Sequence, residues 1–273
     1  MSLTAESFTF VADLVRKRSA IHLAPGKEYL VESRLLPLAR SRGVSVDDYV
    51  RQQRMSPTPL DAEMIVEALT TNETSWFRDA LPFQALTEHI VPQAVAALPG
   101  GAPLRIWSAA CSTGQEPYSI AMTVQEQLPA SRRVEITATD LSGEVLAKAE
   151  RGVYSQLEIN RGLPAKFLVK HFTKQGAEWA IADELRSMVR FSKHNLLAPP
   201  PLGGPFDIVF LRNVLIYFDV DVKRDILRRL RMAMRRDAFL VLGAAETTVG
   251  VDDTWTRVQV GRSSIYQNSG SAA

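Results

Sequence analysis

Segment 104–119, LRIWSAACSTGQEPYS, places small residues and a carboxylate where a strand is expected to turn into a helix. Its first residues form an apolar run typical of a buried strand, and Pro117 suits the first turn of a helix. The small residues between them, which end at Gly114, let a ligand approach the backbone closely. A strand, a tight turn and a helix in this order form the first unit of a nucleotide-type α/β fold.

The charge in this turn indicates which ligand it binds. The turn contains neither Gly-x-Gly-x-x-Gly nor Gly-Lys-Ser/Thr, so the dinucleotide and phosphate-loop fingerprints are both missing. Glu116 stands where a phosphate site would carry a cation, and a carboxylate there attracts a cation instead. A cationic cofactor with an adenosine part, S-adenosylmethionine, fits that sign.

A second carboxylate follows the next expected strand. Residues 134–140, VEITATD, alternate in polarity and end on Asp140. An acid at the end of the second strand is where an α/β fold hydrogen-bonds ribose hydroxyls. The alternative is that Asp140 only caps the helix expected from Ser142. The preceding turn with Gly114 and Glu116 favours the ribose role.

The rest of the chain supplies the elements that must position these residues. Helical spacing of apolar residues up to about residue 70 predicts four helices and no strand. We therefore predict a helical domain over 1–70, a linker and connecting helix over 71–98, and an α/β domain over 99–273. An inserted β-subdomain is expected at about 152–190, with a helix near 164–172 and short strands at 178–181 and 185–191 about a turn at 182–184. Then the α/β pattern resumes, with strands at 206–211 and 238–244 around a helix at 221–235, and a hairpin at 255–266 closes the domain.

The overall composition limits the protein class. A hydrophobic content of 46% with 23% charged residues excludes a disordered chain, and a net charge of +2 gives no global preference for nucleic acid. The single cysteine, Cys111, excludes an internal disulfide and a cysteine zinc cluster, and we predict no metal. No secretory signal and no apolar run of about 20 residues is present, which favours a cytoplasmic protein without membrane insertion.

Basic residues concentrate in the expected helical domain. Such charges are either solvated surface or a docking face for an acidic partner. The arginines that we assign to the docking alternative are Arg34, Arg40, Arg42 and Arg51.

Five segments together resemble the CheR family of chemoreceptor glutamate O-methyltransferases. The resemblance extends from the N-terminal helices to about Tyr266, nearly the whole chain. The matching segments are 72–78 (NETSWFR), 110–121 (ACSTGQEPYSIA), 139–140 (TD), 195–197 (NLL) and 212–218 (RNVLIYF).

The resemblance implies an α/β fold, in which a Rossmann-like S-adenosylmethionine-dependent methyltransferase domain with a small inserted β-subdomain follows an all-helical N-terminal domain. It also implies methylation of glutamate side chains on the cytoplasmic helical bundles of chemoreceptors, with S-adenosylhomocysteine as product. Motif matching gives Tyr217 a place near the reacting centre and assigns the cofactor pocket to Asn72, Thr74, Arg78, Glu116, Asp140, Asn195, Leu196, Arg212 and Asn213.

Two departures from the family pattern are visible. The usual turn has two consecutive glutamates, and here Gln115 replaces the first, so Glu116 carries the contact. Family members that dock on a receptor's C-terminal pentapeptide have a longer hairpin loop than residues 175–178 provide. The resemblance therefore indicates a member that acts without pentapeptide tethering.

The chemistry needs positioning rather than a base. A glutamate side chain has an ordinary pKa of about 4.3 and is ionised near pH 7, so methyl transfer requires no general base. Arg78 is our candidate for orienting the incoming carboxylate through charge-assisted hydrogen bonds, and the Tyr217 hydroxyl can share this task. The alternatives are an ion pair of Arg78 with Glu73 or Asp79, and a core position for Tyr217. Four histidines form no acid–base group, and we expect a structural role for the one inside a motif, His194.

Other functions compete with this interpretation. A basic stretch at 223–236 could meet nucleic-acid phosphates, but the strand end at 212–215 lacks the Asn/Asp-Pro-Pro-aromatic pattern of base methylation, and a solvated helix face is favoured. A non-catalytic cofactor-binding sensor or scaffold, or a methyltransferase for another acceptor such as a small carboxylic acid, also fits the fold. The segment at 70–78 is either a linker whose Trp76 and Phe77 fill the domain interface or a lid over the cofactor cleft.

Overall fold

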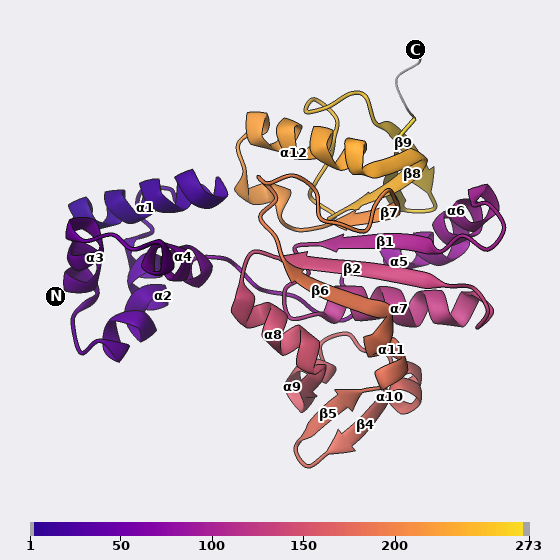
Figure 1. Cartoon of the computed structure of the whole chain (residues 1–273), viewed down its shortest axis with the longest axis horizontal. Helices are drawn as coiled ribbons and strands as arrows, with labels where there is room; N and C mark the ends of the chain where they lie inside the picture. Colours follow the sequence, from indigo (N-terminus) through magenta and orange to yellow (C-terminus); the bar gives the residue numbers. More distant parts are fainter. Residues whose placement is uncertain (1–2, 270–273) are drawn as a thin grey trace. The chain divides into compact units, whose positions relative to one another are not determined.

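The computed structural model describes residues 3–269 (Figure 1). The chain forms two compact units by its internal contacts. One unit holds the residues up to Thr71 together with Tyr217–Val222, and the other holds Asn72–Ile216 and the chain from Lys223 onward.

The smaller unit is built from four helices. They are α1 (Ala5–Ser19), α2 (Glu28–Ser41), α3 (Val46–Met55) and α4 (Pro59–Ala68). The hydroxyls of Thr4, Ser45 and Thr58 accept backbone N–H groups at the starts of α1, α3 and α4, which satisfies donors that a helix start leaves open. The core is apolar and fully buried at Val11, Val15, Val31, Leu35, Tyr49 and Ile65. The four predicted helices are confirmed.

The larger unit is organised on a seven-stranded sheet in the order β6-β2-β1-β7-β8-β10-β9. The first five strands in this order are parallel, and β10 runs antiparallel to both β8 and β9. The strands are β1 (Leu104–Ala109), β2 (Val134–Asp140), β6 (Val189–Lys193), β7 (Phe206–Leu211), β8 (Met234–Leu242), β9 (Thr256–Val260) and β10 (Ser263–Gln267). All six residues of β7 are buried, as expected for a central parallel strand covered on both faces.

Helices connect and cover these strands. After segment 72–80, the unit continues with one helical stretch made of α5 (Leu81–Ala85), the π-helical turn η1 (Leu86–Ile90) and α6 (Val91–Ala97). The crossovers are α7 (Gln115–Gln127) after β1, α8 (Gly143–Arg151) after β2, and the 3-10 turn η2 (Leu215–Tyr217) with α12 (Val220–Ala233) after β7. No helix within residues 3–269 is both long and apolar enough to cross a membrane.

A second, three-stranded sheet is inserted between α8 and β6. Its order is β3-β5-β4, all antiparallel, with β3 at Val153–Ser155, β4 at Phe172–Gln175 and β5 at Glu178–Ile181. Three short helices complete it: α9 (Gln156–Ile159), α10 (Ala165–His171) and α11 (Asp183–Met188).

The predicted hairpin between 178–181 and 185–191 is wrong. The hairpin joins β4 to β5 through Gly176, and residues 183–188 form α11. The physical reason lies in the segment DELRSM, where two acids favour a helix N-terminus and Leu185 and Met188 share one helical face. Residues 189–193 then become β6, the edge strand of the main sheet beside β2.

Candidate active site

The two central strands of the main sheet define where a ligand can bind. β1 and β7 are parallel neighbours, and Ala109 pairs with Leu211 at their carboxyl ends. The chain continues from β1 to β2 and β6 on one side and from β7 to β8 on the other. This reversal is the topological switch point at which open α/β sheets bind ligands. The turn at 110–114 and the loop from Arg212 to Ile216 both start there.

The turn after β1 is held by packing against α8 and β3. Gly114 has φ +95°, and a Cβ on it would lie 2.9 Å from both Ala149 Cβ and the Tyr154 hydroxyl oxygen. That hydroxyl donates to the carbonyl oxygen of Thr113 at 2.9 Å. This close approach leaves no room for a side chain at position 114, so glycine is required there. Contact between the Gly114 backbone and a cofactor remains a prediction.

Glu116 is held at the start of α7 by two donors. The Ser108 hydroxyl donates to its Oε1 at 2.8 Å, and Arg212 Nη1 donates to its Oε2 at 3.0 Å. Burial raises the pKa of Glu116, while Arg212 and the Ser108 hydrogen bond pull this pKa down. Ser108, which sequence reasoning missed, thus helps to keep the carboxylate charged.

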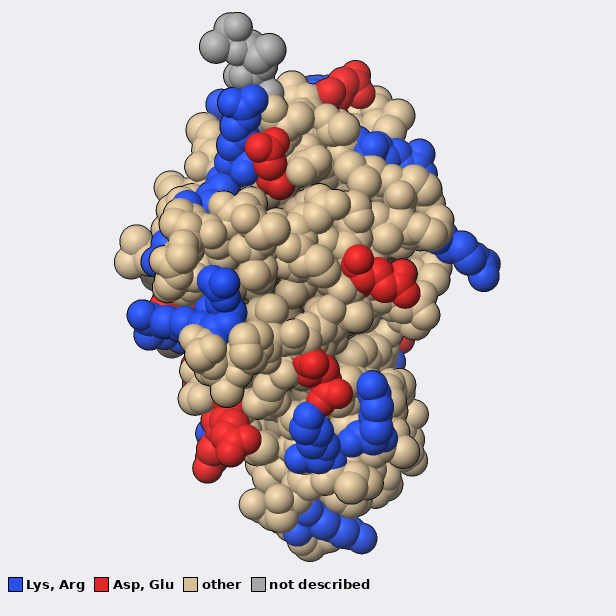
Figure 2. Space-filling model, turned by 90° about the vertical axis from the view of Figure 1, so that its right-hand side faces the viewer, with Lys and Arg blue, Asp and Glu red and all other residues tan. Residues whose placement is uncertain are grey.

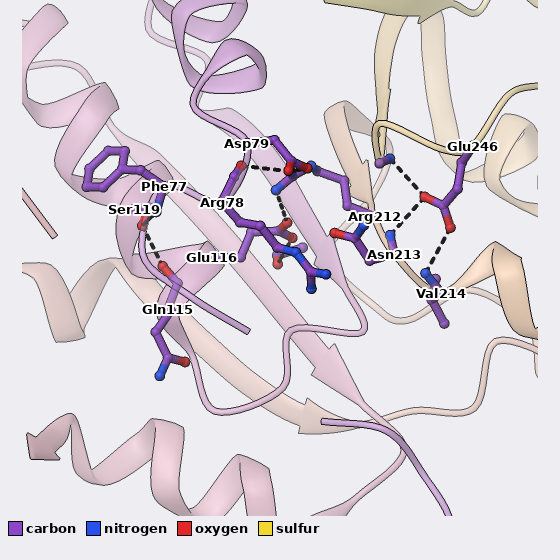
Figure 3. A network of polar contacts seen from close by, with 12 residues as sticks. Phe77, Arg78, Asp79, Gln115, Glu116, Ser119, Arg212, Asn213, Val214 and Glu246 are labelled. Atoms are coloured by element: carbon purple, nitrogen blue, oxygen red, sulfur yellow. Dashed lines mark hydrogen bonds and ion pairs between the residues drawn. The ribbon is translucent and has the colours of Figure 1, made fainter. Parts of the chain in front are cut away.

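Arg212 joins Glu116 to the segment that enters the domain (Figure 3). Its Nη2 donates to Asp79 Oδ2 at 2.7 Å and to the carbonyl oxygen of Arg78 at 2.8 Å. The Arg212 side chain is 1% exposed, and its Nε is buried with no hydrogen-bond partner among the described residues. One buried guanidinium facing two carboxylates leaves this end of the site with an excess of negative charge, which suits a cationic ligand.

Segment 72–80 is fixed by contacts within the larger unit. The Ser112 hydroxyl donates to the carbonyl oxygen of Asn72 at 2.7 Å, and the Phe77 N–H donates to the Ser119 hydroxyl at 3.1 Å. Phe77, Asp79 and Ala80 have positive φ angles, an unfavourable conformation that persists where surrounding contacts fix the backbone. Thr74 lies half-buried in this segment.

The aromatic side chains of this segment pack against the inserted sheet. The Trp76 ring lies 4.9 Å from Tyr154 and 5.4 Å from Phe172, both edge-on, and the Phe77 ring stacks on Phe167 at 5.0 Å. Trp76 and Phe77 thus fill a core inside the larger unit, whereas the first of the two sequence alternatives placed them at an interface between domains.

The Arg78 side chain donates to the carbonyl oxygen of Glu73 at 3.0 Å. Both carboxylates considered as its partners are taken by other arginines, since Glu73 pairs with Arg161 at 3.1 Å and Asp79 with Arg212. In the described part of the chain, Arg78 has no carboxylate partner of its own. Its charge is therefore available to an incoming carboxylate.

Asp140 connects the end of β2 to the turn. Its Oδ2 accepts the Ser112 N–H at 2.8 Å, and its Oδ1 accepts the Ser142 N–H at 3.0 Å. The bond to Ser142 is the helix-cap contact of the alternative interpretation. The bond to Ser112 also places Asp140 beside the turn after β1, as the ribose role requires. Binding of ribose remains a prediction.

The segment expected beside adenine is held by an arginine of α12. The Asn195 side-chain oxygen accepts the Leu197 N–H at 3.0 Å, and Arg229 Nη1 donates to the carbonyl oxygens of Leu196 at 3.2 Å and Leu197 at 2.7 Å. His194 packs edge-on against Trp107 at 5.7 Å, and burial lowers its pKa.

The basic stretch at 223–236 is not simply a solvated face, because five of its arginines have hydrogen-bond or ion-pair partners in this chain, and three of these join it to other elements. Besides Arg229, Arg224 donates to the carbonyl oxygen of Val251 at 3.0 Å and Arg235 pairs with Asp207 at 2.9 Å. On the face shown in Figure 2, Lys and Arg lie in separate groups with Asp and Glu between them. Neither observation favours a nucleic-acid surface.

The loop after β7 is held by Glu246, a residue beyond β8 that sequence reasoning missed. Asn213 has φ +58°, and its N–H donates to Glu246 Oε2 at 2.8 Å. The signal that could have found Glu246 is an acid three residues after Gly243, the glycine that directly follows β8. The described residues contain no group of three His, Cys, Asp or Glu side chains that could hold a metal ion.

The remaining predicted residues lie in the smaller unit, and most of them have partners there. Tyr217 is half-buried, and its carbonyl oxygen accepts the His22 N–H at 3.3 Å. Arg40 is exposed, and its side chain has no hydrogen bond or ion pair in the described part of the chain. The three other arginines bind Thr70 (Arg34), Asp61 (Arg42) and Asp47 (Arg51).

Comparisons with known proteins show which family the chain belongs to. A family model described as "CheR methyltransferase, SAM binding domain" matches residues 72–263, and one described as "CheR methyltransferase, all-alpha domain" matches residues 6–70. The chain belongs to the CheR methyltransferase family. The resemblance read from the sequence is confirmed, as are the fold class and S-adenosylmethionine as the cofactor.

Curated CheR relatives match over nearly the whole chain. Chemotaxis protein methyltransferase 1 of Pseudomonas aeruginosa is 42% identical over 98% of this chain and 99% of its own length. Chemotaxis protein methyltransferase Cher2 of Pseudomonas putida is 42% identical over 93% and 94%. The chemotaxis protein methyltransferase of Escherichia coli is 34% identical over 90% and 86%. CheR methyltransferases of different bacteria thus share both units of this chain.

Proposed function

We propose that this chain transfers the methyl group of S-adenosylmethionine to glutamate side-chain carboxylates of chemoreceptors, giving methyl esters and S-adenosylhomocysteine. Membership of the CheR family and the names of its chemotaxis relatives support the reaction class and the kind of acceptor. The observation that carries the choice of a carboxylate acceptor is Arg78, a cation bound only to a backbone carbonyl in the segment that meets the cofactor turn.

The residues of the switch point fit the cofactor. Glu116 and Asp79 supply negative charge for its sulfonium and ammonium groups, and the buried, unpaired Nε of Arg212 fits a donor for its carboxylate. Asp140 would hold the ribose, with Asn195 and Leu196 beside the adenine. Asn72, Thr74, Gly114 and Asn213 complete the proposed pocket.

The protein's own task in this reaction is to position and desolvate the acceptor. Bound S-adenosylmethionine supplies a methyl group on a positively charged sulfur. The acceptor oxygen bonds the methyl carbon as the carbon–sulfur bond breaks, and the electron pair stays on sulfur. Since a glutamate of pKa about 4.3 is already ionised at neutral pH, no side chain has to remove a proton. Arg78 aims the carboxylate, and such positioning can contribute about 7–11 kcal/mol in ideal cases.

The proposed partner is the cytoplasmic helical bundle of a chemoreceptor, which places the enzyme in the cytoplasm. Methyl-accepting glutamates make that surface acidic, and the exposed Arg40 would attract it. The β4–β5 hairpin turns through only Gly176 and Ala177, between strands that end at Gln175 and begin at Glu178. We therefore propose that this enzyme acts without a pentapeptide tether.

The cofactor part of the proposal is tested by calorimetric titration. We expect S-adenosylmethionine and S-adenosylhomocysteine to bind the wild type and to bind Asp140→Ala at least tenfold more weakly. Absence of binding to the wild type would favour a sensor or scaffold that does not use this cofactor.

The acceptor part is tested with purified cytoplasmic receptor fragments and radiolabelled S-adenosylmethionine. Methyl esters of glutamate release methanol in alkali, whereas methylated amines do not. We expect alkali-labile label that is lost when the acceptor glutamates are replaced by alanine. Stable label, or label on a small carboxylic acid only, would assign the enzyme to another acceptor.

A further inference from the structure

The carboxylate of Glu246 accepts hydrogen bonds from backbone N–H groups of the loop that follows β7 (Figure 3). Its Oε2 accepts the N–H groups of Asn213 and Gly243, each at 2.8 Å. Its Oε1 accepts the N–H of Val214 at 2.9 Å and that of Ile216 at 3.4 Å. A single carboxylate thus binds the backbone that directly follows the neighbouring strands β7 and β8.

The local sequence is shaped around this carboxylate. A Cβ on Gly243 would lie 2.7 Å from Glu246 Oε2 and 2.8 Å from Asn213 Nδ2, so any side chain there would displace one of them. Asn213 has φ +58°, a conformation that asparagine tolerates better than most residues. Backbone N–H groups that converge on one place need a hydrogen-bond acceptor there, and an ionised acceptor such as a carboxylate binds them most strongly.

The loop that Glu246 holds is continuous with the cofactor pocket. Asn213 directly follows Arg212, whose guanidinium joins Glu116 at 3.0 Å to Asp79 at 2.7 Å. The negative charge of Glu246 also raises the pKa of Glu116, so the two carboxylates repel each other electrostatically. A shift of the Asn213 backbone would therefore move Arg212 away from both of its acids.

We infer that Glu246 is a positioning residue for the methionine end of the cofactor: by binding the backbone of 213–216 it holds Arg212 against Glu116 and Asp79. The inference rests on the cofactor pocket of the proposed function. Glu246 itself touches neither methyl group nor acceptor in this role. It acts through the loop, so it sets cofactor affinity rather than the rate of the chemical step.

The test is Glu246→Gln, which keeps the shape of the side chain but turns one acceptor into an NH₂ donor facing N–H groups. We expect its Kd for S-adenosylhomocysteine, measured by calorimetry, to rise at least tenfold. The KM for S-adenosylmethionine should rise in parallel, while kcat at saturating cofactor and the KM for receptor fragment change less than threefold. A residue with only a structural role would not produce this split.

Asp207→Asn is the matched control. Asp207 is the second residue of β7, near the end of the strand opposite to Glu246, and its buried carboxylate accepts the Arg105 N–H at 2.8 Å and pairs with Arg235 at 2.9 Å. We expect a lower melting temperature for this variant with an unchanged Kd. If Glu246→Gln behaves in the same way, with a Kd within threefold of the wild type, the inference is overturned.

A second variant covers the case in which Glu246→Gln does not fold. Glu246→Asp keeps the charge but shortens the reach by one methylene, so it should also raise the Kd, and a wild-type Kd would overturn the inference. A wild type that binds S-adenosylhomocysteine but does not methylate receptor fragments would refute the proposed acceptor and leave the Glu246 result valid. A wild type that does not bind it would refute both.

Discussion

Arg212 donates to Glu116 across 3.0 Å, with the arginine side chain 1% exposed and the glutamate side chain 12% exposed. Burial alone would favour the neutral form of Glu116, and the guanidinium is the largest influence that restores its charge. The charge of Glu116, which we propose attracts the cationic cofactor, therefore depends on Arg212 after β7 as well as on the turn after β1.

Replacement of Arg212 by glutamine should make cofactor affinity depend on pH. The pKa of Glu116 is already above its ordinary value, and loss of the guanidinium would raise it further. As the pH falls through this raised pKa, Glu116 becomes neutral and attracts the cofactor less. We expect the Kd of Arg212→Gln for S-adenosylmethionine, measured by calorimetry from pH 8 to 5.5, to rise more steeply toward low pH than that of the wild type.

The same variant should show the opposite trend in stability. Removing one partner of a buried pair costs about 3–5 kcal/mol near neutral pH. Because the folded state then binds a proton at Glu116 more tightly than the unfolded state, the free energy of unfolding should rise as the pH falls through the raised pKa. The double variant Arg212→Gln/Glu116→Gln lacks this group. A slope that persists in it would assign the titration to another residue.

Gly114→Ala should destabilise the protein more than an alanine at an open glycine with positive φ. The left-handed backbone costs about 1–2 kcal/mol at either site, and contact with Ala149 and Tyr154 adds about 1–3 kcal/mol at Gly114. Gly176→Ala is the control, because its φ is +61° and nothing lies within 4 Å of its Cβ position. Equal losses in denaturant unfolding would show that the close approach contributes nothing.

The places of Gly114, Glu116 and Asp140 in the fold could be predicted because they lie at strand ends. Gly114 and Glu116 follow β1, Asp140 is the last residue of β2, and the carboxyl ends of parallel strands meet at one edge of a sheet. The family resemblance added Asn195 and Arg212, which the structure places at the ends of the same sheet.

The partners of these side chains could not be predicted, because ion pairs join residues far apart in the sequence. Asp79 was considered for Arg78, one residue away, but it pairs with Arg212. Arg229 lies in a run of basic residues that resembles a solvated helix face, and only the fold brings it to the carbonyl oxygens at 196–197. Short elements failed for a related reason: six residues such as 183–188 are too few for a periodic pattern to distinguish helix from strand.

Charge reversal should separate docking from stability at Arg40 and Arg42. Arg42 pairs with Asp61, whose side chain is 9% exposed, so Arg42→Glu would place two carboxylates together and cost about 3–5 kcal/mol. Arg40 has no such partner, and Arg40→Glu should change the free energy of unfolding by no more than about 0.5 kcal/mol. We expect Arg40→Glu to raise the KM for receptor fragments, less so in high salt, without a change in the Kd for S-adenosylhomocysteine.

Reversal at both positions at once would therefore be misleading. A lower activity of the double variant could come from unfolding of the helical unit alone. Thermal unfolding of each single variant decides between the two causes. Unchanged KM in Arg40→Glu at low salt would remove this face from the proposed docking surface.

Arg78→Ala should reduce turnover of receptor fragments while the fold is kept. Arg78 contributes one hydrogen bond to a carbonyl oxygen, at 3.0 Å, so we expect the free energy of unfolding to change by no more than about 0.5 kcal/mol. A charge-assisted hydrogen bond to the acceptor carboxylate contributes about 1.5–3 kcal/mol, so kcat/KM for the receptor fragment should fall about 10–100-fold. Arg161→Ala is the matched control, because this arginine pairs with Glu73 in the same segment and should change kcat/KM less than threefold. If the Kd for S-adenosylhomocysteine rises by the same factor as kcat/KM falls, Arg78 serves the cofactor and another group must orient the acceptor.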